Sequence, residues 1–168
     1  MQGSIGVFWD IVLLRRGPRD LPAAWGLLAT AAAASFAIEF AIIAHRYGTG
    51  IALAHASFDL ALTAAVFSAL LAIRGQGHRL LQTLTALFGV DALLSLPLAL
   101  LSLSAGGEGH HLLGSLVFLA LLAWNLLVIG HIVRVALDVP LLNGVAVAMS
   151  FTILTLLIDR VWPATGAS

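Results

Sequence analysis

Long apolar runs alternate with short polar stretches along most of this chain. Five runs of about 21 to 24 residues stand out, at residues 21–44, 51–73, 80–103, 112–135 and 141–161. A helix rises about 1.5 Å per residue, so roughly 20 apolar residues cross the hydrocarbon core of a bilayer. The pattern therefore predicts five membrane-spanning helices, which together make up one domain over residues 21–168.

The polar stretches between the runs have the composition of tight turns. Glycines occupy the first three of them, and Asp138-Val139-Pro140 closes the fourth run, because proline cannot continue a helix that it interrupts. Connections this short force neighbouring helices to run antiparallel. The expected fold class is all-α, a polytopic membrane bundle of five transmembrane helices.

Residues 1–20 have a different pattern, with apolar positions spaced along one helical face. Positive charge follows the apolar stretch here, whereas a cleaved secretory signal has it in front. A turn at Gly17-Pro18 ends the segment. We expect a short amphipathic helix at the membrane interface, with Trp9 among the headgroups, and a frayed tail is the alternative. The apolar face consists of Ile5, Phe8, Trp9, Val12 and Leu13.

Composition excludes several classes of protein. Of 168 residues, 61% are hydrophobic and 10% are charged, whereas about a quarter of the residues in a soluble domain are charged. The eight basic residues are balanced by eight acidic ones, so we expect no nucleic-acid partner. Cysteine is absent, which excludes disulfides, thiolate nucleophiles and cysteine-ligated metals. We expect no cofactor.

The arginines predict an orientation. Six of the eight fall on segments that meet at one end of such a bundle: Arg15, Arg16, Arg19, Arg74, Arg79 and Arg134. Only Arg46 and Arg160 fall at the other end. Because cytoplasmic loops carry the excess of basic residues, the N-terminus is expected in the cytoplasm and the C-terminus outside. Arginine without lysine, in a chain rich in alanine and leucine, indicates a GC-rich bacterial genome and hence an inner membrane with a periplasmic C-terminus.

Ionisable residues inside the spans are the most informative ones. A carboxylate at bilayer depth is expensive, so Glu39, Asp59 and Asp91 are expected to face the interior of the bundle. Asp91 falls nearest the centre of its span, while His55 and Asp59 share a helix face. Arg46 is expected to neutralise Glu39, seven residues before it. With Asn125 of the fourth span, the expected intramembrane cluster is Glu39, Arg46, His55, Asp59, Asp91 and Asn125.

Three interpretations of this cluster remain open. It is a structural network that fixes helix register, a pathway for protons or a substrate, or a metal site completed by Glu108, His110 and His111 of the outer loop. The spacing favours the metal least, and no sequence motif indicates a catalytic site. We therefore expect neither a metal nor an enzymatic activity.

A second polar group follows the inner end of the fourth span. His131, Arg134 and Asp138 recur at helical spacing, so Arg134 and Asp138 are expected to pair near the headgroups. This inner interfacial patch indicates either an anchor or a docking site for another subunit or an anionic lipid.

Three segments resemble a known family. They are FWDIVLLRRGP at 8–18, QTLTALFGVDALLSL at 82–96 and WNLLVIGHIVRVALD at 124–138. Together with the number of spans, they resemble the small bacterial members of the Yip1-like family. The resemblance implies a five-helix integral membrane protein without assigned chemistry. The Asp-Leu-Tyr-Gly-Pro motif of the eukaryotic Yip1 proteins is missing, so no trafficking role carries over.

The sequence as a whole favours a non-enzymatic scaffold or accessory subunit of a membrane assembly. Its expected partners are the lipid bilayer and another membrane protein or a second copy of the chain. The alternative is a small transporter or proton-conducting component that uses the intramembrane carboxylates Asp59 and Asp91.

Overall fold

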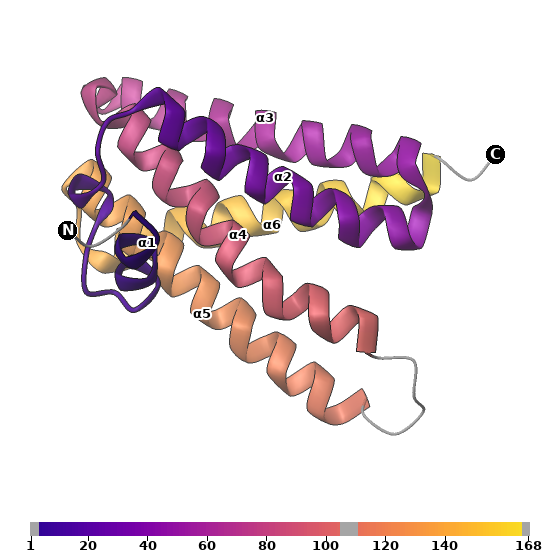
Figure 1. Cartoon of the computed structure of the whole chain (residues 1–168). Helices are drawn as coiled ribbons and strands as arrows, with labels where there is room; N and C mark the ends of the chain where they lie inside the picture. The colour runs from indigo at the N-terminus through magenta and orange to yellow at the C-terminus, as the bar shows by residue number, and fades with distance from the viewer. Residues whose placement is uncertain (1–3, 105–110, 166–168) are drawn as a thin grey trace.

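The computed structural model describes residues 4–104 and 111–165. Five long helices form one bundle in which successive helices run in opposite directions (Figure 1). Each is long and apolar enough to cross a membrane. The described chain is therefore an all-α, multi-pass membrane protein in contact with the lipid bilayer. The five helices are α2 (Trp25–Tyr47), α3 (Thr49–Ile73), α4 (Leu80–Ser104), α5 (His111–Leu137) and α6 (Leu141–Thr165).

Local backbone chemistry sets where the first two spans begin. The hydropathy pattern starts the first span at Leu21, but α2 begins at Trp25. Leu21 precedes a proline and takes extended angles, φ −86° and ψ 143°, because proline disfavours a helical conformation in the residue before it. A single residue, Gly48, separates α2 from α3, and its φ of +87° is one that glycine adopts without strain.

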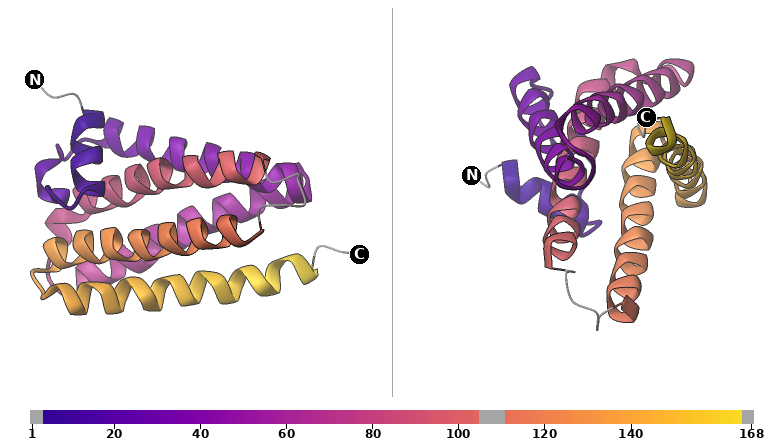
Figure 2. Two further views of the ribbon diagram at one scale, coloured as in Figure 1. Left: turned by 90° about the horizontal axis from the view of Figure 1, so that it is seen from below. Right: turned by 90° about the vertical axis from the view of Figure 1, so that its right-hand side faces the viewer.

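The helices form two groups. Helices α2, α3 and α4 pack together, α5 packs mainly on α6, and a lesser contact between α4 and α5 joins the groups (Figure 2). The backbones of α5 and α6 touch, since a Cβ atom on Gly144 would lie 2.2 Å from the carbonyl oxygen of Gly130. Only a residue without a side chain fits there, as in other small-residue contacts between membrane helices.

The apolar core is concentrated toward one end of the bundle, which we call the basic end. This end holds the chain before α2, the α3–α4 connection and the α5–α6 turn (Figure 1), and six arginines lie on these segments and on the last turn of α5. Core residues here include Phe67, Leu71 and Ile132. At the opposite end α4 and α5 diverge from α2 and α3 (Figure 1), and Gly114–Ala120 of α5 are exposed.

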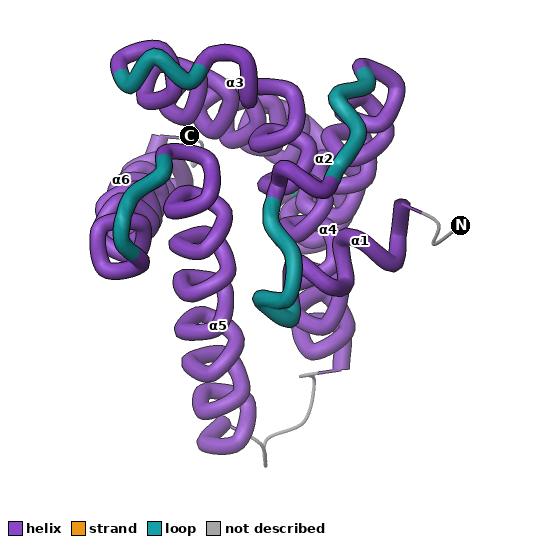
Figure 3. The backbone as a smooth tube through the Cα atoms, turned by 90° about the vertical axis from the view of Figure 1, so that its left-hand side faces the viewer, coloured by secondary structure: helices purple, strands orange, loops and turns teal. Residues whose placement is uncertain are grey.

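The short helix α1 (Ser4–Val12) crosses the bundle near the basic end and lies beside α4 (Figures 2 and 3). The ring of Phe8 packs directly on Gly89, where a Cβ atom would lie 2.2 Å from it. The Trp124 indole of α5 donates a hydrogen bond to the Val12 carbonyl at 3.2 Å. The predicted short N-terminal helix is thus present and is fixed to two spans.

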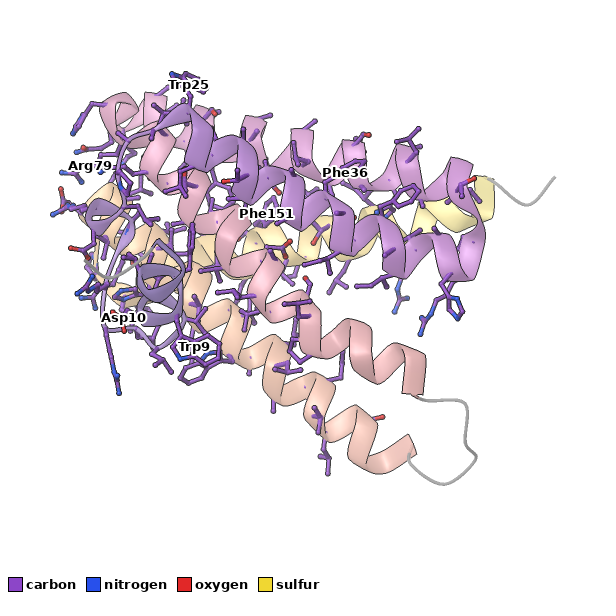
Figure 4. The ribbon with its side chains drawn as sticks, viewed as in Figure 1. Trp9, Asp10, Trp25, Phe36, Arg79 and Phe151 are labelled. Carbon is purple, nitrogen blue, oxygen red and sulfur yellow. The ribbon has the colours of Figure 1, made fainter. Side chains whose placement is uncertain are left out.

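The apolar face of α1 is divided between protein and surroundings, which the sequence pattern did not anticipate. Phe8 and Val12 are buried with Val7 and Ile11, whereas Trp9 is 56% exposed. The reason is that the neighbouring spans cover one side of the helix and leave the indole of Trp9 outside (Figure 4). The Ile5 side chain lies outside the described residues.

A second short element, the 3-10 helix η1 (Pro18–Asp20), links α1 to α2. The Asp20 carboxylate accepts a hydrogen bond from the Gly17 amide at 2.9 Å. Gly17 lies close to α5, because a Cβ atom there would lie 2.8 Å from the side chain of Val135. The predicted turn at Gly17-Pro18 is therefore packed against the bundle.

Candidate functional site

A polar cavity of about 230 Å³ lies among the five spans. A space of this size admits several water molecules. Every span contributes side chains to it, and the polar side chains among them are all acidic, hydroxyl or amide groups. The lining consists of Ser35 from α2, Asp59, Thr63 and Phe67 from α3, Leu87, Phe88, Val90 and Asp91 from α4, Leu122, Asn125 and Ile129 from α5, and Phe151, Thr152, Thr155 and Leu156 from α6.

Asp91 is held by two serine hydroxyls. The Ser35 hydroxyl of α2 donates to Asp91 Oδ2 at 2.5 Å, and the Ser95 hydroxyl, one turn further along α4, lies 3.5 Å from Oδ1. These bonds supply part of the solvation that a carboxylate loses inside a membrane. They also tie α2 to α4 at the wall of the cavity.

Asp59 approaches the cavity from α3. It lies one helical turn before Thr63, and both residues line the cavity because positions four apart share a helix face. His55, one turn earlier, lies with its Nδ1 atom 2.8 Å from Glu39 Oε1 of α2. Glu39 and His55 therefore join α2 to α3 beside the cavity and are not part of its lining.

The expected contact between Glu39 and Arg46 is replaced by the one between Glu39 and His55. Arg46 is exposed in the last turn of α2, which ends at Tyr47. A cation is favoured in this last turn by the helix dipole. The predicted cluster thus separates into the cavity residues Asp59, Asp91 and Asn125, the bonded pair Glu39 and His55, and an outlying Arg46.

Several cavity residues were not singled out from the sequence as candidates for the site. Ser35 and Thr63 each lie four residues from an acidic residue on the same helix, Glu39 and Asp59. That spacing is the signal that identifies them, since it places hydroxyls on the acidic faces. Thr155 of α6 shows the same spacing, because Asp159 follows it by four residues, whereas Thr152 has no acidic residue four positions away.

A second polar cluster lies at the basic end and centres on Asp138. Its carboxylate accepts hydrogen bonds from Arg19 of η1 and from Arg79 Nη1, the latter at 2.8 Å. The same arginines donate to backbone carbonyls near the end of α5, Arg19 to Val135 at 2.9 Å and Arg79 to Ala136 at 3.0 Å. The hydrogen bonds from Arg79 and Arg19 hold the pKa of Asp138 below its usual value.

The predicted pairing of Arg134 with Asp138 is wrong. Helix α5 ends at Leu137, and Asp138 takes a left-handed conformation with φ of 54°. Its side chain therefore leaves the face that carries Arg134 and reaches the preceding segments of the chain, and Arg134 is exposed. His131, the third predicted member, lies with Nε2 2.9 Å from the Arg16 carbonyl oxygen, so this nitrogen carries the proton in that bond.

The part of the chain that the structure describes contains no cluster of side chains that could bind a metal ion. No group of three or more His, Asp or Glu residues there is arranged to hold a metal ion. Glu108, His110 and the side chain of His111, which the metal interpretation invoked, lie outside the described residues.

Comparison of the chain with models of protein families, with curated proteins and with solved structures finds no match.

Proposed function

We propose that this membrane protein is a small transporter or proton-conducting component, without enzymatic activity, that takes a proton or a small solute into the cavity between its spans. The observation that carries the proposal is the convergence of all five spans on one polar cavity with two carboxylates, Asp59 and Asp91. On insertion scales a carboxylate at the centre of a span costs about 3 kcal/mol. Intramembrane acids are retained mainly where protons, ions or substrates pass.

The proposed route enters from the opposite end of the bundle. The apolar core fills the basic end. A crevice too narrow to admit water lies within this core, and it is lined by Phe67, Leu70, Leu71, Thr83, Val133, Ala136 and Leu137. Phe67 lines both spaces, and its ring is the barrier that we propose between them. A proton or solute in the cavity therefore reaches the basic end only if the group α2, α3 and α4 moves relative to α5 and α6. We accordingly propose that it binds in the cavity first and crosses to the basic end in a second step.

We also propose a membrane, an orientation and a related family for this protein. We place the chain in a bacterial inner membrane with its basic end in the cytoplasm, on the strength of the six arginines at that end. The likeness to small Yip1-like membrane proteins is supported by the five spans and the short N-terminal helix.

Flux through the purified protein tests the function. In liposomes loaded with a pH-sensitive dye, the parent protein should dissipate a proton gradient faster than protein-free liposomes do, either alone or when a transported solute is added. Asp91→Asn should abolish this flux, because an amide releases no proton. Glu39→Gln is the matched control, since Glu39 is an intramembrane carboxylate outside the cavity lining. Flux equal to that of empty liposomes, or unchanged in Asp91→Asn, would contradict the proposal.

A second candidate function is a scaffold or accessory subunit, and one observation favours it. Seven consecutive residues of α5, Gly114–Ala120, are exposed, whereas a helix packed on one side buries about half of such a stretch. Either lipid or another membrane helix covers this surface. If the scaffold interpretation holds, a photo-crosslinking amino acid in place of Phe118 should capture a defined partner in native membranes. The same amino acid in place of Leu53 of α3 is the control and should not capture that partner. Lipid adducts alone at Phe118 would contradict the scaffold.

A further inference from the structure

The charged side chains of the cavity carry one sign only. Its described lining holds two carboxylates and no arginine or histidine. An anionic ligand would have to approach Asp59 and Asp91 in surroundings of low dielectric, where like charges repel strongly. The electrostatics thus favour a cation over an anion.

Aromatic rings form a second part of the same lining. Phe67 of α3 and Phe151 of α6 contact each other with ring centroids 5.2 Å apart and planes tilted by 59°. Phe88 of α4 adds a third ring, so rings approach the cavity from three helices. Figure 4 places Phe151 midway along the bundle. The faces of such rings attract cations, most strongly where water is excluded.

The hydroxyl and amide groups complete the set. Thr63, Thr152 and Asn125 line the cavity from three different helices. They offer hydrogen bonds to a polar tail, while the carboxylates and rings offer a place to a charged head. An inorganic cation would use the oxygen atoms and leave the rings without a role.

We propose that the cavity binds a small organic ammonium ion, its charged head between the carboxylates and the phenylalanine rings and its polar tail toward the hydroxyls. This rests on the proposed function, for which it names the class of substrate. The cavity of about 230 Å³ has room for a cation of this class.

Binding is measured on the purified full chain with choline as the probe. Its matched control is 3,3-dimethyl-1-butanol, which has the same shape without the charge. Choline should raise the melting temperature in a saturable way, since a ligand that binds only the folded state stabilises it. The neutral isostere should bind at least about tenfold more weakly, and sodium chloride at equal ionic strength should give no saturable shift.

Substitutions assign the binding to this cavity. Asp91→Asn should weaken choline binding about tenfold or more, and Asp59→Asn gives a second reading if the first variant does not fold. Phe151→Leu, which keeps an apolar side chain but removes the ring, should weaken it about threefold. Phe36→Leu is the control, because Phe36 stacks on Phe40 of α2 and is not part of the lining.

The outcomes separate this inference from the function on which it rests. Equal binding of choline and its neutral isostere, or no saturable shift with choline, would overturn the ammonium site even if the liposomes show flux. Choline binding that depends on Asp91 and Phe151 supports the site even if the liposomes show no flux. In that case only the proposed transport function would be wrong.

Discussion

At the scale of single residues, the bond between Ser35 and Asp91 is central, because it joins two helices at a carboxylate inside the membrane. Ser35→Ala removes the shorter of the two serine contacts and leaves Asp91 with Ser95 at 3.5 Å. We expect the variant to lose about 1–3 kcal/mol of stability, the usual effect of leaving a buried polar group poorly bonded. Thermal unfolding in detergent measures this loss.

The matched control is Ser150→Ala, because the exposed Ser150 hydroxyl bonds only a carbonyl of its own helix. In an Asp91→Asn background the effect of Ser35→Ala should shrink, since an amide has less need of the donated bond. Equal losses in both backgrounds would show that Ser35 acts by packing alone.

Acid should loosen the cluster around Asp138. Its pKa is lower in the folded protein than in the unfolded chain, so its stabilising contribution is present above the unfolded value of about 3.9 and is lost as the pH falls through the folded value. The melting temperature should therefore fall below about pH 4. Asp138→Asn should lack this component of the fall, and a parallel acid profile in the variant would contradict the assignment.

At the scale of elements, the contact between α1 and α4 depends on the absence of a side chain at Gly89. Gly89→Ala should destabilise the protein by about 1–3 kcal/mol, because its Cβ atom would lie 2.2 Å from the Phe8 ring. Phe8→Ala makes room for the new methyl group, so the second substitution should cost less in that background. Melting curves of the parent, the two single variants and the double variant measure this coupling.

Gly114→Ala is the control for this pair, since nothing lies within 4 Å of a Cβ atom at Gly114. Additive effects at positions 8 and 89 would mean that α1 adjusts its position without depending on the contact.

The elements themselves could be predicted from the sequence to a large extent. Apolar length predicts the five spans, and the starts of the first two needed backbone detail, namely extended Leu21 before Pro22 and the single residue Gly48 between α2 and α3. The exposed side of α1 could not be predicted, because hydropathy does not distinguish a lipid interface from a protein neighbour. Trp9 and Phe8 are alike in sequence pattern and opposite in burial.

The candidate site could be predicted in part. Depth and helical spacing single out Asp59 and Asp91, because charge inside a span is rare enough to stand out. Hydroxyl residues such as Ser35 are common in membrane helices, so their spacing from a carboxylate is a weaker signal than the charge itself. The partners of Asp138 depend on one left-handed residue after α5, and a helical-face argument cannot foresee that.

At the scale of the whole molecule, the orientation is open to a direct test. A reporter active only outside the cytoplasm should work when it is fused after Ser168 and fail when it is inserted at Gln76, in the α3–α4 connection. An active fusion at Gln76 would reverse the orientation and place the mouth of the cavity in the cytoplasm.

Access to the cavity can be followed with single cysteines, because the chain has none of its own. Thr155→Cys lines the cavity and should react with a water-soluble thiol reagent, whereas Thr83→Cys lines the dry crevice and should not. Phe67→Ala should let water pass and raise the reactivity of Thr83→Cys about tenfold or more. The substitution Phe36→Ala, away from both spaces, should leave the reactivity of Thr83→Cys unchanged. If Thr83→Cys stays unreactive in the Phe67→Ala background, Phe67 is not the barrier to water.

The bond between Arg19 and Asp138 also bears on how the protein is made. The two residues are 119 positions apart in the chain, and a ribosome adds about 5–20 residues per second. At that rate roughly 6–24 s pass between the synthesis of one partner and that of the other. The segment before α2 therefore waits without its final contacts until helices α2 to α5 have been synthesised, and α6 is then still to be made.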